Sequence, residues 1–427
     1  MTSLLLENAR LIDPASNLDR AGRLLVTDGK IAAIDPREGK LPEGCERMDL
    51  DGMILCPGLI DIGAELGEPG REEDETIADG LAAAVAGGYT TVVCSANTLP
   101  PLDSAAGVQF VLQKAARCDS ARVHVLGCVS RGRGGEEMAE IGSLFEAGAV
   151  GLSDRPSAIA NTALLKAALE YCMMFDRPII EHSVVPSLTA RGVMHEDLTQ
   201  LLLGLPPLPA EAEDLATARN LRLVEATGGK LHLASISTSG SVDLCRRGRG
   251  RSVEFTAGVH VANTHLDDKR LRSFDANYKV DPPLRSASHL ADIQAGLRDG
   301  TIDIISSGHR PVAAEKKVQE LNAAPFGMIA LQTTLAEVST FLVRPGVLDW
   351  PAAVAKLSTN PAKLFGLPGG TLRVGGPADL AVIDPRAEWV YRVAEDPSRS
   401  RNSPFDGQRF IGRVVRTLVG GQCKWAV

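Results

Sequence analysis

The stretch Pro57-Gly-Leu-Ile-Asp-Ile-Gly-Ala-Glu-Leu-Gly-Glu-Pro-Gly70 carries the strongest information about the fold. It follows the apolar run Met53-Ile-Leu-Cys56, which is typical of a buried strand, and Pro and Gly mark turns on both sides. Side chains on a strand alternate between its faces, so Asp61, Gly63 and Glu65 would share one face. In a parallel barrel, the end of a strand and the loop behind it build the active site. We therefore expect a site here.

Strand-like and helix-like segments alternate along the middle of the chain, which is typical of an α/β protein with a parallel sheet and crossover helices. Eight strand–helix units over about 250 residues match the size of a (β/α)8 TIM barrel. The eight expected strands are Met53–Asp61, Tyr89–Cys94, Val123–Val129, Val150–Ser153, Pro178–His182, Lys230–Ile236, Ser252–His260 and Ile302–Ser307.

Both ends of the chain show short strand patterns with tight turns. Asp28-Gly29 lies between two apolar runs and is a strong hairpin signal, and Arg413–Val419 is a strand pattern that ends in glycine. Chain termini often lie close together. We therefore expect residues 1–52 plus 366–427 to form a small β-sandwich domain, and residues 53–365 to form the barrel domain.

Composition restricts the partners and the compartment. The net charge of −8 favours solubility and argues against a nucleic-acid partner, and the basic cluster Arg246–Arg251 is interpreted as a solvated loop. No apolar run is long enough to span a bilayer, so no membrane is expected. The eight cysteines are scattered without a Cys-x-x-Cys pair, which favours a reduced, cytoplasmic protein.

Several further motifs follow the expected strands in order. They are Ser95-Ala-Asn-Thr-Leu-Pro-Pro-Leu-Asp103, Leu231-His-Leu-Ala-Ser-Ile-Ser-Thr238, Asp275-Ala-Asn-Tyr-Lys-Val-Asp-Pro-Pro-Leu-Arg285, Ile302-Asp-Ile-Ile-Ser-Ser-Gly-His-Arg-Pro-Val312 and Asn402-Ser-Pro-Phe-Asp-Gly407. Together with the stretch at residues 57–70, their order and spacing resemble the dihydroorotases, zinc enzymes of the amidohydrolase superfamily. The resemblance covers essentially the whole chain and implies the amidohydrolase type of TIM barrel with a small β-sandwich domain.

The resemblance also assigns chemistry to positions in this chain, and most of these positions carry other residues. Hydrolysis of a cyclic amide needs a metal that activates water, ligands that hold it, and a general base. The replaced positions are Gly63 and Glu65 for paired metal histidines, Gly67 for a substrate-binding arginine, Ser235 for a ligand histidine, Gly308 for the catalytic aspartate and Val312 for a substrate-contacting histidine.

A few polar residues remain at positions that the resemblance assigns to the site. Asn97 stands at a substrate-binding position, and Asp281 replaces an asparagine near the substrate. Asp154 and His182 stand at metal-ligand positions. With Glu65 as a third ligand they would form one mixed carboxylate–imidazole zinc site, although a polar residue that fills a vacated cavity is the simpler interpretation of Glu65.

These losses lead us to expect a non-catalytic dihydroorotase homologue, a pseudoenzyme without a metal cofactor. The resemblance implies a structural or regulatory partner of aspartate transcarbamoylase in pyrimidine biosynthesis, in a homo- or hetero-oligomer. One alternative is an active metal-dependent dihydroorotase, or another cyclic amidohydrolase, with a divergent mono-metal site that would use Glu65, Asp154, His182 and, as a base, His309. A second alternative is a regulator that binds a ligand in the old pocket.

Overall fold

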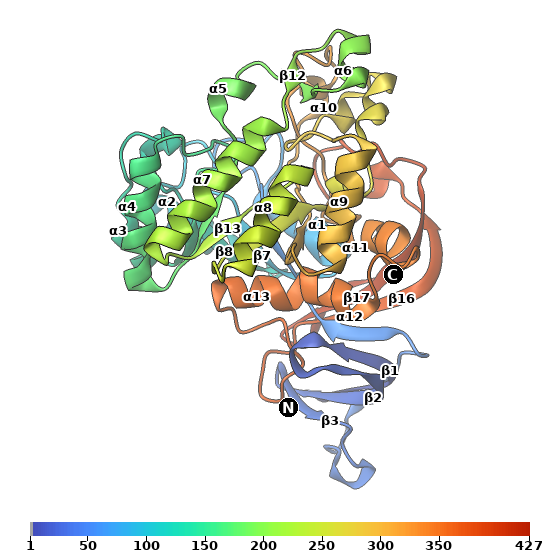
Figure 1. The fold of residues 1–427 in the computed structure, drawn as a ribbon. Coiled ribbons are helices and arrows are strands. Elements are labelled where there is room, and N and C mark those ends of the chain that lie inside the picture. The colour runs from blue at the N-terminus through green and yellow to red at the C-terminus, as the bar shows by residue number, and fades with distance from the viewer. Residues whose placement is uncertain (1–2) are drawn as a thin grey trace.

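The computed structural model describes residues 3–427, and its largest part is a barrel of eight parallel strands (Figure 1). The barrel strands pair in chain order, and β15 returns to β6, where the backbone N–H of Ser307 donates to Asp61 Oδ1 at 2.7 Å. They are β6 (Leu59–Ala64), β7 (Tyr89–Cys94), β8 (Arg122–Gly127), β9 (Ala149–Leu152), β10 (Ile179–Glu181), β13 (Leu231–Leu233), β14 (Thr256–His260) and β15 (Ile304–Ser306). The expected parallel barrel is confirmed.

Along the chain, helices alternate with the barrel strands, and in the fold these helices cover the outside of the barrel (Figure 1). Several begin at a Ser or Thr whose hydroxyl accepts from a backbone N–H, as Thr76 does for α1 and Thr238 for α8. The main helices are α1 (Ile77–Ala86), α2 (Ala105–Ala115), α3 (Ile141–Glu146), α4 (Thr162–Cys172), α7 (Glu211–Thr227), α8 (Ser239–Gly250), α9 (Ala287–Arg298), α11 (Thr334–Val338), α12 (Trp350–Val354) and α13 (Asn360–Phe365).

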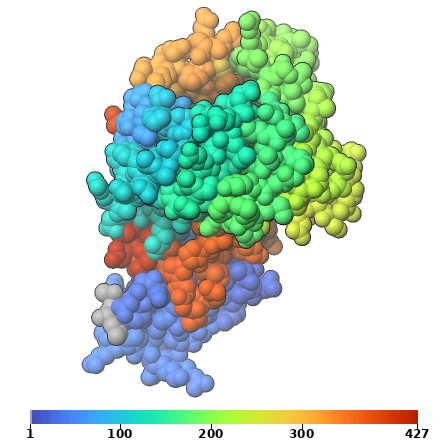
Figure 2. Space-filling model, turned by 90° about the vertical axis from the view of Figure 1, so that its left-hand side faces the viewer, coloured from blue at the N-terminus to red at the C-terminus, as the bar shows by residue number. Residues whose placement is uncertain are grey.

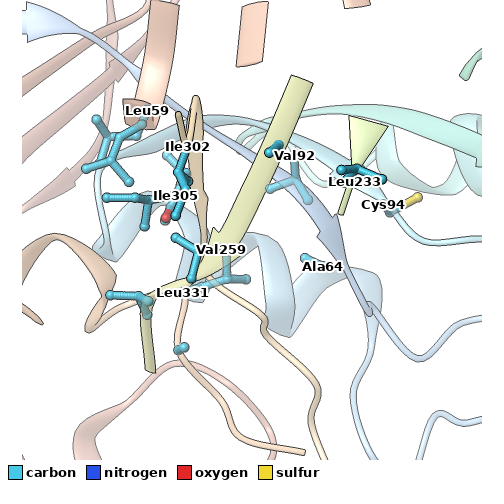
Figure 3. Packing of buried hydrophobic residues seen from close by; sticks show 14 of the residues in the cluster. Leu59, Ala64, Val92, Cys94, Leu233, Val259, Ile302, Ile305 and Leu331 are labelled. Atoms are coloured by element: carbon cyan, nitrogen blue, oxygen red, sulfur yellow. The ribbon is translucent and has the colours of Figure 1, made fainter. Parts of the chain in front are cut away.

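Apolar side chains fill both sides of the barrel wall. The larger cluster lies between strands and helices, and Figure 3 shows Val92, Leu233 and Val259 among its members. A second cluster comprises Ile62, Val93, Leu126, Val150, Ile180, Ala234, Ile304 and Phe365. Consecutive residues such as Val92 and Val93 thus belong to different clusters, as expected for strands buried on both faces.

A separate sheet combines strands from both ends of the chain and lies beyond one end of the barrel (Figures 1 and 2). Its order is β18-β17-β16-β5-β1-β2-β3, and β4 pairs with β1. The bounds are β1 (Ser3–Asp13), β2 (Leu18–Thr27), β3 (Lys30–Ile34), β4 (Glu46–Asp49), β5 (Ile54–Pro57), β16 (Leu380–Val390), β17 (Arg409–Val419) and β18 (Gln422–Ala426). The expected sheet from both chain ends is confirmed, and the exact domain bounds stay a prediction.

The stretch expected as one strand, Met53–Asp61, is two strands in different sheets. β5 pairs antiparallel with β16, whereas β6 begins the barrel. The break falls at Pro57-Gly58, where the chain passes close to β7, because a Cβ on Gly58 would lie 2.1 Å from Thr90 Oγ1.

The loops at the carboxyl ends of the barrel strands carry short elements on the side of the molecule away from the N-terminal strands (Figure 1). These elements are α5 (Pro186–Thr189), β11 (Met194–His195), α6 (Leu198–Leu203), β12 (Pro207–Leu208) and α10 (Ala314–Lys317). Within residues 3–427, no helix combines the length and apolarity that crossing a membrane requires.

Candidate active site

Glu65 follows the end of β6 and is bound by polar groups from three loops. Asn97 Nδ2 donates to Glu65 Oε2 at 2.8 Å. Arg71 Nη1 lies 3.6 Å from Oε2, and Arg310 Nε lies 3.4 Å from Oε1. The Glu65 carboxylate is therefore neutralised by two guanidinium groups, and Asn97 is held in place by the same cluster.

Asp154 follows β9 and turns toward the loop after β8. Its Oδ1 accepts from the backbone N–H groups of Val129 at 2.8 Å and Ser130 at 3.2 Å, and its Oδ2 accepts from the Ser130 hydroxyl. Burial raises the pKa of Asp154, while these hydrogen bonds act in the opposite direction. Both carboxylate oxygens are thus engaged in holding a loop.

His182 lies at the end of β10 and contacts the loop that precedes α9. Its Nε2 lies 3.4 Å from Asp281 Oδ1. Burial alone would raise the pKa of Asp281, but the charges of His182, Arg310 and Arg155 hold that pKa below its ordinary value. Asp281 is therefore a carboxylate at neutral pH.

The predicted trio of Glu65, Asp154 and His182 does not form a metal-binding cluster, because each of the three side chains is engaged with a different neighbour. Across residues 3–427, no group of three or more His, Cys, Asp or Glu side chains is arranged to hold a metal ion. Gly63 and Gly308 offer no donor atom, and the hydroxyl of Ser235 is buried without a partner. The side chains at the barrel mouth thus do not fit the metal that the family resemblance implies.

Two residues that the sequence did not single out, Arg155 and His260, occupy the centre of the mouth. Arg155 Nη2 donates to His260 Nε2 at 2.9 Å. A Cβ on Gly63 would lie 3.1 Å from Arg155 Nη1, and a Cβ on Gly308 would lie 2.7 Å from His260 Cγ. Arg155 and His260 therefore use the space that the two glycines leave. The paired loss of side chains at residues 63 and 308 was the available sequence signal.

His260 is a neutral imidazole in this arrangement. Burial, followed by the charge of Arg155, lowers the pKa of His260 well below its ordinary value. A neutral ring accepts the Arg155 hydrogen bond at Nε2 and carries its own proton at Nδ1. The pair therefore presents one positive charge, on the guanidinium.

Gly67 and His309 have structural roles near the mouth. Gly67 has φ +72°, and a Cβ there would lie 2.0 Å from the carbonyl oxygen of Glu75, so no side chain fits at this turn. The His309 ring is buried, its Nδ1 accepts from the backbone N–H of Ala330 at 3.1 Å, and its Nε2 lies 3.5 Å from Glu75 Oε2. His309 therefore does not present a free base to the pocket.

Val312 and Ser235 contribute no charge to the site. The backbone N–H of Val312 donates to Asn402 Oδ1 at 3.1 Å, and the Val312 side chain is buried. Ser235 is also buried, on the loop after β13.

Two neighbouring cavities open at the carboxyl ends of the strands. The larger has a volume of about 410 Å³, and His182, Arg133, Arg285 and Phe326 are among its walls. The smaller, of about 30 Å³, lies against Arg155 and His260. Pro156 and Asp281 line both. The mouth can therefore hold a small ring in the larger cavity with a polar substituent in the smaller one.

Comparison with known proteins matches both halves of the chain to related families. Residues 52–241 match the dihydro-orotase-like family, and residues 254–423 match the amidohydrolase family. A protein from Rhodopirellula baltica named putative dihydroorotase is 49% identical over 424 residues, which are 99% of this chain and 93% of that protein. A Syntrophus aciditrophicus protein named dihydroorotase is 42% identical over 419 residues, 98% of each chain.

Solved structures share the fold. The L-hydantoinase (dihydropyrimidinase) from Arthrobacter aurescens superposes with a TM-score of 0.86 at 23% identity and covers 99% of this chain and 96% of its own. The dihydropyrimidinase from Brevibacillus agri NCHU1002 has a TM-score of 0.85 at 21% identity, and the match covers 100% and 96% of the two chains. At these identities the likeness shows the fold alone.

These relatives overturn two expectations. The interpretation as a non-catalytic pseudoenzyme is wrong, because full-length relatives named dihydroorotase point to a hydrolytic enzyme. The expectation of no cofactor is contradicted as well, because the family resemblance implies a metal, even though the side chains at the mouth do not form a ligand cluster. Missing motif residues were a weaker guide to activity than similarity over the whole chain. The chain belongs to the dihydroorotase family of amidohydrolases.

Proposed function

We propose that this chain is a cyclic amidohydrolase that opens a ring of the dihydroorotate type. The observation that carries the proposal is 42% identity over 419 residues, 98% of each chain, to a protein named dihydroorotase. The match therefore covers both the barrel and the sheet formed by the chain ends. The two cavities at the barrel mouth supply room for a small polar ring.

The residues around the cavities offer binding and proton transfer. The guanidinium group of Arg155 would orient the ring, and that of Arg310 would stabilise negative charge that develops on a carbonyl oxygen during attack. Asp281 is a carboxylate that lines both cavities, and it would position the attacking water and pass its proton to the ring nitrogen as the amide C–N bond breaks. His182, 3.4 Å from Asp281, would orient that carboxylate.

Turnover of matched rings tests this function. Purified protein is mixed with dihydroorotate or with dihydrouracil, with and without added zinc, and ring opening is followed by loss of ultraviolet absorbance. We expect opening of at least one ring, and a loss of about 100-fold or more in the Asp281→Asn variant with an unchanged circular dichroism spectrum. No opening of either ring under any of these conditions would contradict the proposal.

Cytoplasmic location belongs to the same proposal. The free cysteines Cys56, Cys94 and Cys128 are buried in the core, and burial raises the pKa of Cys94 to about 12, so this thiol is unreactive. The predicted oligomer, the predicted association with aspartate transcarbamoylase, and the expected absence of nucleic-acid and membrane partners are not tested by these observations and stay predictions.

A further inference from the structure

Arg155, unlike Arg71 and Arg310, has no carboxylate within salt-bridge distance in the described part of the chain. Arg71 and Arg310 both lie within 4.0 Å of the Glu65 carboxylate. Among residues 3–427, no Asp or Glu oxygen lies within that distance of an Arg155 side-chain nitrogen, and Arg155 Nε is enclosed without a hydrogen-bond partner. The neutral ring of His260 accepts one hydrogen bond but offers no counter-charge.

A guanidinium in this position is costly unless something compensates it. An enclosed charge loses its hydration, and an unpaired donor loses a hydrogen bond. The side chains that line both cavities carry one more positive charge than negative charges. Four arginines and three carboxylates line them, namely Arg133, Arg155, Arg285 and Arg310 against Glu65, Glu213 and Asp281. Arg285 lies next to Glu213 and Arg310 lies next to Glu65, which leaves Arg133 and Arg155 with Asp281 alone.

The small cavity beside Arg155 has the size of an anionic group. A water-sized group needs about 10–15 Å³ of such volume, so about 30 Å³ accommodates about two oxygen atoms. The cavity adjoins the larger one across Pro156 and Asp281. A ligand with a ring in the larger cavity can therefore place a carboxylate in the smaller one.

We propose that Arg155, backed by His260, binds the carboxylate of a carboxylated cyclic amide at the centre of the barrel mouth. The guanidinium N–H groups that His260 leaves free form a fork that suits a carboxylate. Gly63 and Gly308 are part of this site, because side chains there would contact Arg155 and His260. This assignment rests on the proposed ring-opening function and names the two residues of this chain that hold the carboxylate.

Equilibrium binding of two unsaturated rings, which cannot be opened by this reaction, tests the site separately from turnover. Orotate carries the carboxylate, and uracil has the same ring without it. Isothermal titration with the whole protein is expected to give at least 10-fold tighter binding of orotate. Arg155→Gln should weaken orotate about 10- to 100-fold and leave uracil unchanged. Arg298→Gln, on the exposed end of α9, is the matched control and should bind as the unaltered protein does.

Three binding results would contradict the assignment of Arg155 to the carboxylate. Equal binding of orotate and uracil, or unchanged orotate binding in Arg155→Gln, would overturn the site. Formate or phosphate that binds as tightly as orotate would also overturn it, since ring and carboxylate would then not be recognised together. Should Arg155→Gln fail to fold, Arg155→Lys keeps the charge without the fork, and it is expected to bind orotate more weakly than the unaltered protein; equal affinity would again contradict the proposal. Orotate binding without any ring opening would contradict the proposed function alone.

Discussion

Two regions differ in how their positive charges are satisfied. One is the frame, meaning the loops and helices around the barrel, and the other is the barrel mouth that the loops surround. In the frame, Lys279 Nζ donates to the carbonyl oxygens of Leu321 at 2.7 Å and Ala324 at 2.6 Å. At the mouth, Arg155 has a neutral imidazole and an adjoining cavity. A frame whose polar groups are satisfied internally does not depend on the ligand. Substitutions at the mouth can therefore occur without loss of the fold.

The largest expected effect comes from removing Arg285, a cation in the wall of the larger cavity whose partners are protein groups. Arg285 is buried, donates to Ser237 Oγ at 3.0 Å and to the carbonyl oxygen of Leu208 at 2.9 Å, and lies 3.5 Å from Glu213. Arg285→Ala would leave the buried Glu213 carboxylate with its hydrogen bonds from Ser237 and Thr238 but without its cation, and should lower the free energy of unfolding by about 3–5 kcal/mol. Urea denaturation measures this, with Arg298→Ala as the control. A loss under about 1 kcal/mol would show that the fold does not depend on the internal partners of Arg285.

A smaller effect is expected at the mouth from Gly308→Ala. Gly308 has φ +64°, and the added Cβ would meet the His260 ring at 2.7 Å. Gly300→Ala is a close control, because Gly300 has φ +82° and open space around its Cβ position. In both variants the left-handed backbone conformation should lower the free energy of unfolding by about 1 kcal/mol. Gly308→Ala should lower it by about 1–3 kcal/mol more and should also bind orotate more weakly.

Equal stability of these two glycine variants, measured by urea denaturation, would show that His260 moves aside freely. Arg155 and His260 would then be a loose pair, and the mouth would not be a site shaped by its glycines.

The smallest expected effect per step measured is the change in stability per pH unit that the buried carboxylate of Glu337 causes. Burial raises the pKa of Glu337 to about 8, although Thr333 Oγ1 donates to its Oε1 at 2.6 Å. The folded chain therefore keeps a proton that the unfolded chain releases near pH 4.5, so stability is greatest below that pH and falls as the pH rises to 8. The slope is at most about 1.4 kcal/mol per pH unit.

Glu337→Gln should flatten this part of the stability profile, measured as the urea midpoint at several pH values. Glu181, whose pKa burial also raises to about 8, should keep part of the slope in the variant. Identical profiles for the two proteins would show that Glu337 does not titrate in this range.

The sequence predicted the barrel and the chain-end sheet because strand and helix patterns alternate along most of the chain. It joined two strands of different sheets into one, because Met53–Ile60 carries no charged residue and the break at Pro57-Gly58 lies inside it. It also made the strands at residues 230–236 and 252–260 longer than β13 and β14 are. It marked Gly63 and Gly308 as vacated positions. It could not show that Arg155 and His260 fill them, since these residues come from different strands and meet only in the folded chain.

The alternative in which Asp154 and His182 share a metal is not supported by the arrangement of their side chains, for a related reason. A motif position specifies where a residue stands along the chain, whereas the direction of its side chain depends on partners from other loops. Asp154 accepts hydrogen bonds from Val129 and Ser130, and His182 contacts Asp281. The inference of inactivity from single positions was then overturned by similarity over the whole chain.

A crystal structure of the protein grown with zinc and soaked with orotate would show what Arg155 binds. We expect the ring in the larger cavity, with its carboxylate within hydrogen-bond distance of the Arg155 guanidinium and with His260 still in contact behind it. A metal ion held by Glu65 and His182, with Arg155 turned out of the barrel mouth, would contradict this expectation.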